Sequence, residues 1–245
     1  MNFSFCINTY SGHGKDCGVF IPQIISSIEE QNIPNYEILI CGDYQIERKN
    51  VRCIPFDESQ RSGWITRKKN ILTKEAQYNN LCFLHDYIYL LPNWYKGWLH
   101  FGSEWDAGLN VILNQDNTRF RDLIAFDDLE NPGPKHFQHK NFPEDKSITT
   151  APYLPDYKYK KFNKTYISGS YFVIKKYLME QEPFDEKLTH GLPEDIEFSM
   201  RIRNKYHLIF NTYCGVKLTK YKDSVWKSLY PYHMTYDYIT KDFIT

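Results

Sequence analysis

Acidic side chains follow two apolar segments of the chain and open a third, amphipathic segment. Asp43 ends the stretch EILICGD, and His85 and Asp86 follow the apolar run LCFL. Glu194 and Asp195 open the stretch EDIEFSMRIR. A carboxylate at a strand end can hold a divalent cation that in turn holds a diphosphate. A partly desolvated carboxylate can also remove a proton as a general base.

Each of these positions also has a purely structural explanation. Aspartate is favoured in turns, so Asp86 could terminate a strand, and His85 could be a hydrogen-bonded residue beside it. Pro193 suits the first position of a helix, and the acids that follow it complement the helix dipole. Glu197 and Arg201 form an i, i+4 pair on that helix. The residues alone leave both explanations open.

A glycine-rich stretch near the N-terminus, GHGKDCG, follows a strand-like segment and precedes a helix-like one. A phosphate-binding loop of the P-loop type needs glycine five residues before its Gly-Lys pair and serine or threonine after it. Thr9 and Asp16 occupy those two positions. The sequence therefore does not favour a P-loop nucleotide hydrolase, and these glycines indicate a tight turn near a ligand.

Apolar spacing predicts the elements that must position the acids. Continuous apolar runs predict strands at residues 3–7, 37–41, 51–56 and 81–84, and the stretch YISGSYFVIKKYL predicts a strand that leads into a helix. Isoleucines at 21, 24, 25 and 28 predict a helix with Pro22 in its first turn. Further helices are predicted at 66–77, around Trp94–Phe101 and at LPEDIEFSMRIRN.

The alternation of strands and helices predicts an α/β fold with a mostly parallel sheet and helices on both faces. Ligands of such sheets bind beyond the carboxyl ends of the strands. Asp43, Asp86 and the loop after Ile7 all belong to that edge. No repeat or linker divides the chain, so we expect residues 1–245 to form one domain.

Composition narrows the possible partners and location. Thirty basic and thirty acidic residues cancel, which gives no support to a nucleic-acid partner held by bulk charge. No apolar run approaches the roughly 18 residues of a membrane span, and the N-terminus lacks a signal-peptide pattern. Six cysteines show no zinc-like spacing. We therefore expect a cytoplasmic protein with reduced thiols and no transmembrane segment.

Six segments, in this order, resemble the GT-A fold glycosyltransferases, particularly the family 2-like nucleotide-sugar enzymes. They are FCINTY, ILICGD, RKKNILTKEA, CFLHDYIYLLPNW, ISGSYFVIK and GLPEDIEFSMRIR, and the resemblance covers most of residues 3–210. It implies a nucleotide-sugar-binding half at about 1–100 and an acceptor-side half at about 101–245. The C-terminal segment of the second half would close as a lid.

The resemblance also implies roles on the donor side. Thr9 would contact the nucleotide, and Asp43 would hydrogen-bond the imide of a uracil ring. Lys69 and Asn70 match the Arg-Asn pair of the family and would place a cation near the diphosphate. Arg67 is a second candidate for that charge.

Asp86 matches the last acid of the Asp-x-Asp metal motif of the family, and His85 beside it is assigned to the donor site. Leu84 stands where the first acid would be, so one metal ligand is lost or supplied from elsewhere. Some relatives add a C-terminal histidine, for which His233 is the candidate; a packed histidine in an aromatic cluster is the alternative. The implied cofactor is Mn²⁺ or Mg²⁺, bound by Asp86 and His233.

On the acceptor side, Ser168 and Gly169 resemble the small-residue segment that lets the donor sugar approach the backbone. Asp195 matches the catalytic acid of the Glu-Asp motif. Glu194 would bind the acceptor or orient the site. The resemblance thus implies that Asp195 removes the proton of the acceptor hydroxyl and that the sugar is transferred with inversion.

The function implied is a glycosyltransferase of the hexosyltransferase type that moves a sugar from a nucleotide sugar, with UDP as the expected carrier. Two alternatives stay open: a nucleotidyltransferase, and a non-catalytic sugar- or protein-binding module on a degenerate transferase fold. The Pro- and His-rich segment 129–165 and the aromatic tail from Trp226 are expected to frame the acceptor side. The sugar and the acceptor cannot be read from the sequence.

Overall fold

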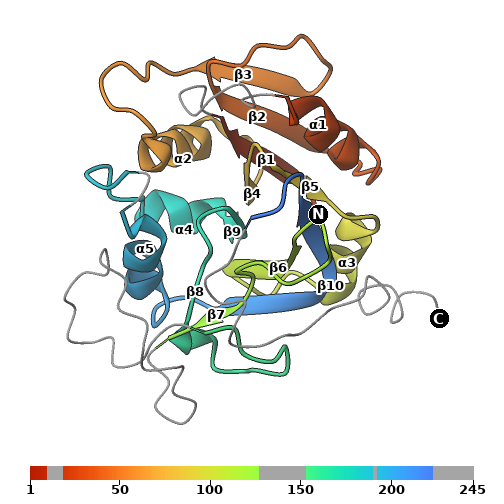
Figure 1. The fold of residues 1–245 in the computed structure, drawn as a ribbon, viewed down its shortest axis with the longest axis vertical. Coiled ribbons are helices and arrows are strands. Elements are labelled where there is room, and N and C mark those ends of the chain that lie inside the picture. Colours follow the sequence, from red (N-terminus) through yellow and green to blue (C-terminus); the bar gives the residue numbers. More distant parts are fainter. Residues whose placement is uncertain (10–18, 127–152, 190–191, 223–245) are drawn as a thin grey trace.

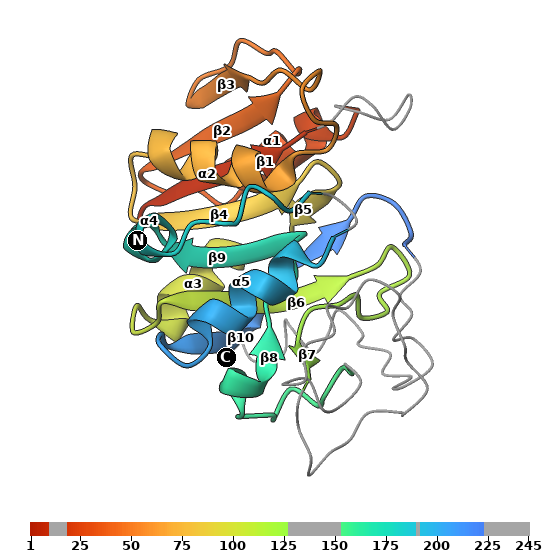
Figure 2. The ribbon, with the colours of Figure 1, turned by 90° about the vertical axis from the view of Figure 1, so that its left-hand side faces the viewer.

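The described residues of the computed structural model, 1–9, 19–126, 153–189 and 192–222, form an eight-stranded sheet with helices on both faces (Figures 1 and 2). The strand order is β3-β2-β1-β4-β9-β6-β10-β5. β1 pairs in parallel with β2 and β4, β2 with β3, and β6 with β10. The predicted α/β fold with a mostly parallel sheet is therefore confirmed.

The first four strands lie where apolar runs predict them. They are β1 (Phe3–Asn8), β2 (Tyr36–Gly42), β3 (Val51–Pro55) and β4 (Asn80–His85). The helices between and after them are α1 (Ile21–Glu29), α2 (Ile65–Glu75) and α3 (Trp94–Phe101). Pro22 lies in the first turn of α1, where no helical N–H is lost.

The second half of the chain adds strands to the same sheet. They are β5 (Ile88–Leu90), β6 (Ala107–Leu113), β9 (Tyr171–Lys175) and β10 (Leu208–Leu218). A two-stranded sheet of β7 (Ile124–Ala125) and β8 (Thr165–Tyr166) lies apart, next to the 3₁₀-helix η2 (Phe162–Lys164). The last helices are α4 (Lys176–Gln181) and α5 (Glu194–Ile202). The prediction of Pro193 as the first helical residue is wrong by one position, because its ψ of 55° is not helical and α5 begins at Glu194.

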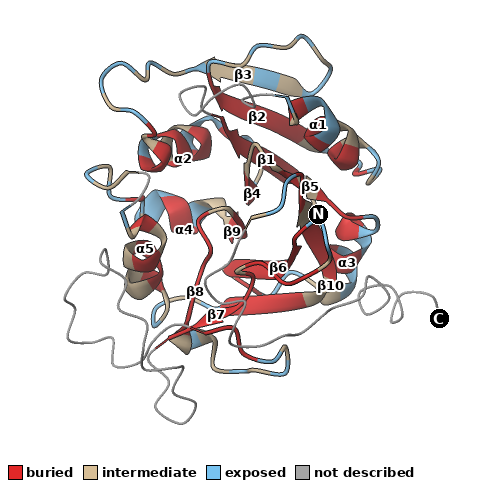
Figure 3. Cartoon of the chain, in the orientation of Figure 1, coloured by how far each residue is buried: buried red, intermediate tan, exposed pale blue. Residues whose placement is uncertain are grey.

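Alternating side chains of the strands supply two apolar layers. Phe3, Phe5 and Ile7 of β1 pack with α1 and α3 on one face. Cys6 of β1 packs with the layer under α2, α4 and α5 on the other, which is the face toward the viewer in Figure 2. Figure 3 shows β1, β2 and β6 buried along their length, whereas β3 at the edge is partly exposed. The five cysteines of the described residues are free thiols.

The position of β9 brings the middle of the chain to the edge where ligands are expected. β9 runs antiparallel to β4, with Tyr171 opposite Leu84. The residues just before β9 therefore lie beside the carboxyl end of β4, and the N–H of His85 donates to the carbonyl of Ser170 (3.0 Å). Segment 168–170 and the turn after β4 thus meet, although more than 80 residues separate them in the sequence.

The carboxyl ends of β1 and β2 also meet closely. The N–H of Thr9 donates to the carbonyl of Cys41 (3.1 Å). A Cβ placed on Gly42 would lie 2.6 Å from Cγ2 of Thr9 and 2.7 Å from its carbonyl oxygen. Only glycine lets these two strand ends approach so closely, and Asp43 follows directly.

Within the described residues, no helix is both apolar and long enough to pass through a bilayer.

We predict that Gly42→Ala lowers the free energy of unfolding by about 1–3 kcal/mol, because the new methyl group meets backbone atoms that cannot rotate away. Gly108→Ala is the matched comparison. Its Cβ would also lie within 3 Å of other atoms, but these are the side-chain ends of Ile209 and Trp98. Urea denaturation should show a larger loss for Gly42→Ala. Equal losses would contradict the close approach of β1 and β2.

Candidate functional site

The centre of the site is the backbone of Gly169, which is held from two sides. Its N–H donates to Oδ2 of Asp195 (3.0 Å), and its carbonyl oxygen accepts from Nζ of Lys69 (2.9 Å). Asp195 comes from α5, Lys69 from α2 and Gly169 from the segment before β9. Three distant parts of the sequence therefore share two hydrogen bonds, and we call this arrangement the Gly169 bracket.

Glu194 lies against the same glycine. A Cβ on Gly169 would be 2.9 Å from Oε1 of Glu194 and 3.3 Å from Oδ2 of Asp195. Both carboxylates thus lie on the side of Gly169 where any other residue would carry its side chain. The structure thus brings together Gly169, Glu194 and Asp195, to which the sequence analysis assigned roles in sugar transfer, and those roles stay a prediction.

Burial makes this group of charges unusual. Burial and the negative charge of Asp195 together raise the pKa of Glu194 to about 7, and Lys69 opposes this shift. Burial also raises the pKa of Asp195, against hydrogen bonds from the N–H groups of Gly169 and Ile196. Burial lowers the pKa of Lys69, and both acids oppose that shift. A fully buried ammonium group thus serves as the counter-ion of two carboxylates.

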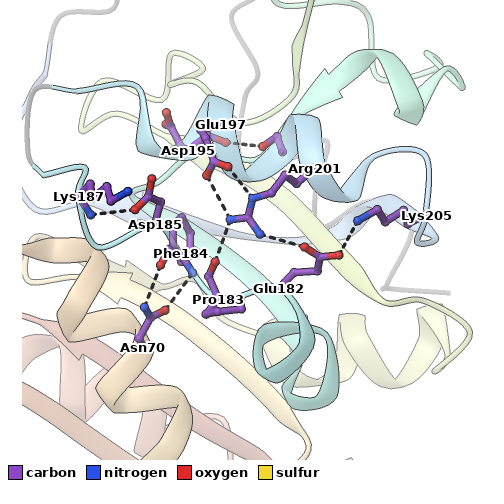
Figure 4. Close-up of polar contacts among 11 residues, drawn as sticks. Asn70, Glu182, Pro183, Phe184, Asp185, Lys187, Asp195, Glu197, Arg201 and Lys205 are labelled. Carbon is purple, nitrogen blue, oxygen red and sulfur yellow. Dashed lines mark hydrogen bonds and ion pairs between the residues drawn. The ribbon is translucent and has the colours of Figure 1, made fainter.

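Hydrogen bonds and ion pairs of its side chains fix the position of α5, the helix that carries Glu194 and Asp195. Arg201 on α5 donates to Glu197 on the same helix, to Glu182 (3.0 Å) and to the carbonyl of Pro183 (2.8 Å) after α4 (Figure 4). Ser199 Oγ accepts from the N–H of Ile167 (2.9 Å), two residues before Gly169. The i, i+4 pair predicted from the sequence is therefore part of a wider network that fixes the helix carrying Asp195.

The helix α2 holds its three predicted residues in different surroundings. Asn70 donates to the carbonyl of Phe184 (2.9 Å) and accepts from its N–H (3.0 Å), so its amide ties α2 to the chain after α4 (Figure 4). Arg67 forms a half-exposed ion pair with Glu186 (2.8 Å). Of these three, only Lys69 contacts the Gly169 bracket.

Lys68, which sequence reasoning missed, is fully buried. Its Nζ donates to the carbonyl of Thr9 (2.6 Å) and forms an ion pair with Glu58. Consecutive lysines of α2 therefore fix two separate parts of the site: Lys68 holds the end of β1, and Lys69 holds Gly169. The signal was the spacing, because Lys68 and Lys69 fall three and four residues after Ile65 and therefore share the helix face that Ile65 and Leu72 bury.

The remaining predicted donor-side residues lie at the carboxyl ends of the parallel strands. Thr9 is buried after β1, and Asp43 is exposed after β2. His85 ends β4 and packs edge-on against Tyr87 (ring centroids 5.4 Å apart), and Asp86 lies in the turn that follows. Ser168 is buried, and its hydroxyl lies 2.9 Å from that of Ser170.

Two buried tyrosine hydroxyls lie within the electrostatic reach of the acids of the site. The pKa of Tyr87 is raised by burial and by the charges of Asp86 and Glu194, while Arg121 lowers it. The pKa of Tyr166 is raised by burial and by Asp195 and Glu194, and Arg121 again lowers it. Asp86 and Glu194 are therefore near enough to act on the phenol of Tyr87, and Arg121 acts on both tyrosines.

Metal ligands are incomplete in the described part of the chain. No cluster of three or more His, Cys, Asp or Glu side chains there could hold a metal ion. Leu84, at the position of the first acid of the motif, is fully buried in the apolar layer. Asp86 is the one predicted ligand among the described residues, and these residues alone do not fit a metal centre.

Several predictions concern parts of the chain outside the described residues. They are the metal ligand His233, the glycine-rich stretch after Thr9, most of the segment 129–165, and the tail from Trp226. These predictions stay untested. The described end of the segment 129–165 contributes Tyr153, which pairs with Ala125, and the 3₁₀-helix η2.

Comparison with solved structures supports the fold. S. aureus TarS 1–349 in complex with UDP-GlcNAc aligns with a TM-score of 0.59 at 16% identity, over 94% of this chain and 62% of that one. GalNAc-T7 with UDP, GalNAc and Mn²⁺ aligns with a TM-score of 0.61 at 14% identity, over 99% and 47%. Both are GT-A-like glycosyltransferases, so the predicted resemblance in fold is confirmed.

The chain is shorter than these neighbours and covers less than two thirds of each. No protein-family model and no curated protein matches its sequence. At 14–16% identity the likeness establishes the fold alone. What the site does must be argued from its own residues.

The electrostatics of Glu194 predict a pH dependence of stability. A carboxyl pKa that rises on folding stabilises the protein below the unfolded value, and this contribution is lost as pH rises through the folded value. We therefore predict a change in the difference between two free energies of unfolding, that of Glu194→Gln minus that of the native protein. This difference should increase by roughly 1–3 kcal/mol as the pH is raised from 4.5 to 8.

Urea denaturation at both pH values measures this difference. Glu180→Gln is the control, because Glu180 is an exposed glutamate on α4. The control should follow the native protein at both pH values. If Glu194→Gln also follows it, Glu194 titrates as an ordinary surface carboxylate and the described coupling is wrong.

Proposed function

We propose that this protein is a glycosyltransferase that moves a sugar from a nucleotide sugar to a hydroxyl group of an acceptor. The observation that carries the proposal is the Gly169 bracket: Asp195 and Glu194 lie against a glycine backbone at the carboxyl end of the parallel strands. The glycine lets both carboxylates approach its backbone, and a carboxylate held there can act as a base for a hydroxyl group that enters the site.

The reaction proposed is a single displacement. The carboxylate of Asp195 accepts the proton of the acceptor hydroxyl while the acceptor oxygen forms a bond to the anomeric carbon. The bond from that carbon to the phosphate oxygen breaks, and the nucleoside diphosphate leaves with the electron pair. Attack from the side opposite the leaving group inverts the anomeric centre. Burial favours this role because it raises the proton affinity of Asp195.

Lys69 has a positioning role in this proposal. Its ammonium group bonds to the Gly169 carbonyl and balances the charges of Glu194 and Asp195. It therefore keeps Asp195 ionised enough to act as a base in a buried setting. Glu194, whose pKa is raised to about 7, is suited to bind an acceptor hydroxyl.

The donor would lie across the ends of β1, β2 and β4. We assign the base to the region of Thr9 and Asp43, and the diphosphate to the turn of His85 and Asp86. UDP is the proposed carrier, because the aligned TarS and GalNAc-T7 structures contain UDP-GlcNAc and UDP. Ser168 and Gly169 would then face the sugar. Arg67 and Asn70, which bond to the chain after α4, would support α2.

We also expect a divalent metal at the donor site, but none of the reaction steps described above depends on it. The aligned GalNAc-T7 structure contains Mn²⁺, and Asp86 offers one oxygen ligand here. His233 is the second proposed ligand. Bound there, Mn²⁺ or Mg²⁺ would neutralise charge on the diphosphate.

We predict that Asp195→Asn lowers the rate of sugar transfer, or of UDP-sugar hydrolysis without acceptor, by about 10²–10⁴-fold, the range for loss of a positioned base. UDP affinity should change little, because Asp195 does not contact the proposed nucleotide region. The assay is UDP release from a panel of UDP-sugars. Asp185→Asn is the control, since Asp185 is an exposed acid in the chain before α5.

Near-normal rates in Asp195→Asn would contradict the assignment of the base. Release of pyrophosphate from a nucleoside triphosphate plus sugar phosphate would favour a nucleotidyltransferase instead. Binding of UDP-sugars without turnover in the native protein would favour a binding module.

A further inference from the structure

We propose that Arg121, Lys220 and Lys222 form a cationic subsite that binds the diphosphate of the donor beside Asp86 and takes up the charge of the leaving group. We call these three residues the basic cluster. This inference rests on the proposed function, because it names the groups of the same site that would contact the phosphates. Sequence reasoning assigned no role to any of them.

The cluster surrounds the turn that carries Asp86. Nζ of Lys222 lies 3.9 Å from the centre of the Tyr87 ring, and Nζ of Lys220 lies 5.8 Å from it. Arg121 acts on the hydroxyl of the same tyrosine. Two ammonium groups therefore lie about one aromatic side chain, directly after Asp86 in the sequence, and the charge of Arg121 acts on Lys222.

The protein fixes this position with hydrogen bonds. The side-chain amide of Asn114 accepts from the N–H of Lys222 (3.0 Å) and donates to its carbonyl (3.1 Å). Thr219 donates its N–H (2.8 Å) and its hydroxyl (3.2 Å) to the carbonyl of Tyr87. The chain after β10 is thus tied to the turn after β4 and to the end of β6. Such fixation reduces the entropy lost when a ligand binds.

The positive charges of the cluster outnumber the acids that act on them, since Asp86 is the one described acid among the electrostatic partners of Lys222. No carboxylate within the described ranges forms an ion pair with Arg121, Lys220 or Lys222, although charged side chains elsewhere in those ranges form several such pairs. Nε of Arg121 is buried without a hydrogen bond, and the backbone of this residue has a φ of +44°. Residues other than glycine rarely adopt positive φ. An anion would satisfy groups that the described chain leaves unsatisfied.

The proton affinities agree with this view. Burial and the nearby charges of Lys220 and Arg121 together lower the pKa of Lys222 to about 8, while Asp86 opposes this shift. Like charges have been brought together at a cost, as they are in sites that bind anions. A diphosphate would reverse the sign of that interaction.

Arg121 connects the basic cluster to the surroundings of Glu194 and Asp195. Arg121 is close to Tyr166 as well as Tyr87, and Tyr166 lies within the field of Asp195 and Glu194. A diphosphate at the cluster would therefore place the sugar toward Gly169. As the bond to the anomeric carbon breaks, negative charge grows on the phosphate oxygens, where fixed cations stabilise the transition state most.

The test compares the affinities of UDP and uridine for the full chain by titration calorimetry, with and without EDTA. In Lys222→Gln, UDP affinity should fall at least about tenfold, or about 1.4 kcal/mol, while uridine affinity stays unchanged. Arg121→Gln should show the same pattern. Lys96→Gln removes an exposed lysine from α3 and is the matched control. Circular dichroism verifies that each variant is folded.

The outcomes separate the two proposals. If the native protein binds UDP and Lys222→Gln and Arg121→Gln bind it equally well, the cationic subsite is wrong and the proposed function stands. If both variants lose uridine and UDP affinity equally, the cluster supports the fold and contacts no phosphate. If the native protein binds neither UDP nor UDP-sugars, the proposed function fails, and the subsite with it.

Discussion

A buried lysine that bonds to a glycine carbonyl and balances the charge of two nearby carboxylates is the constraint on which the rest of this structure depends. Two acids placed against the Gly169 backbone repel each other and lose hydration, so they need a cation within the same buried volume. Lys69 supplies that charge from α2, and its own burial is tolerable only because the acids are there. The three groups therefore require one another.

This mutual dependence explains several features that have no direct part in chemistry. Because α2 must present Lys69 at a fixed depth, Asn70 ties it to Phe184 and Lys68 ties it to the end of β1. Because α5 must present Asp195, Arg201 ties it to Glu182 and Pro183. The antiparallel entry of β9 is also required, since it brings segment 168–170 to the carboxyl end of β4. The fold thus carries its polar centre on elements that are fixed at both ends.

The sequence predicts the first half of the sheet well, for a physical reason. β1, β2 and β4 are buried on both faces, so they read as continuous apolar runs, and the isoleucines of α1 mark a single face. β6 and β10 are less visible. AGLNVIL and LIFNTYCGVKL contain glycine and asparagine, and those asparagines are buried against each other, where Asn110 donates to the carbonyl of Asn211 (3.2 Å). The hydrogen-bond partner of a buried asparagine can be identified only when the pairing of the two strands is known.

The residues of the site also differ in how far the sequence alone can predict them. Glu194, Asp195 and Gly169 could be selected by motif, because the motif sets local spacing. The bond between Gly169 and Lys69 could not be predicted in this way, since it depends on the register of β9 against β4 and on the rotation of α2. Arg121, Lys220 and Lys222 carry no motif at all, and only the docking of the chain after β10 onto the turn of Asp86 brings them together.

A crystal structure of the protein with UDP tests the central claim most directly. We predict that the uracil ring of UDP lies near Thr9 and Asp43. The diphosphate should lie between the Asp86 turn and Gly169, with its terminal phosphate directed toward Asp195. Density for UDP at any other face of the sheet, or a diphosphate remote from Gly169 and its two acids, would contradict it.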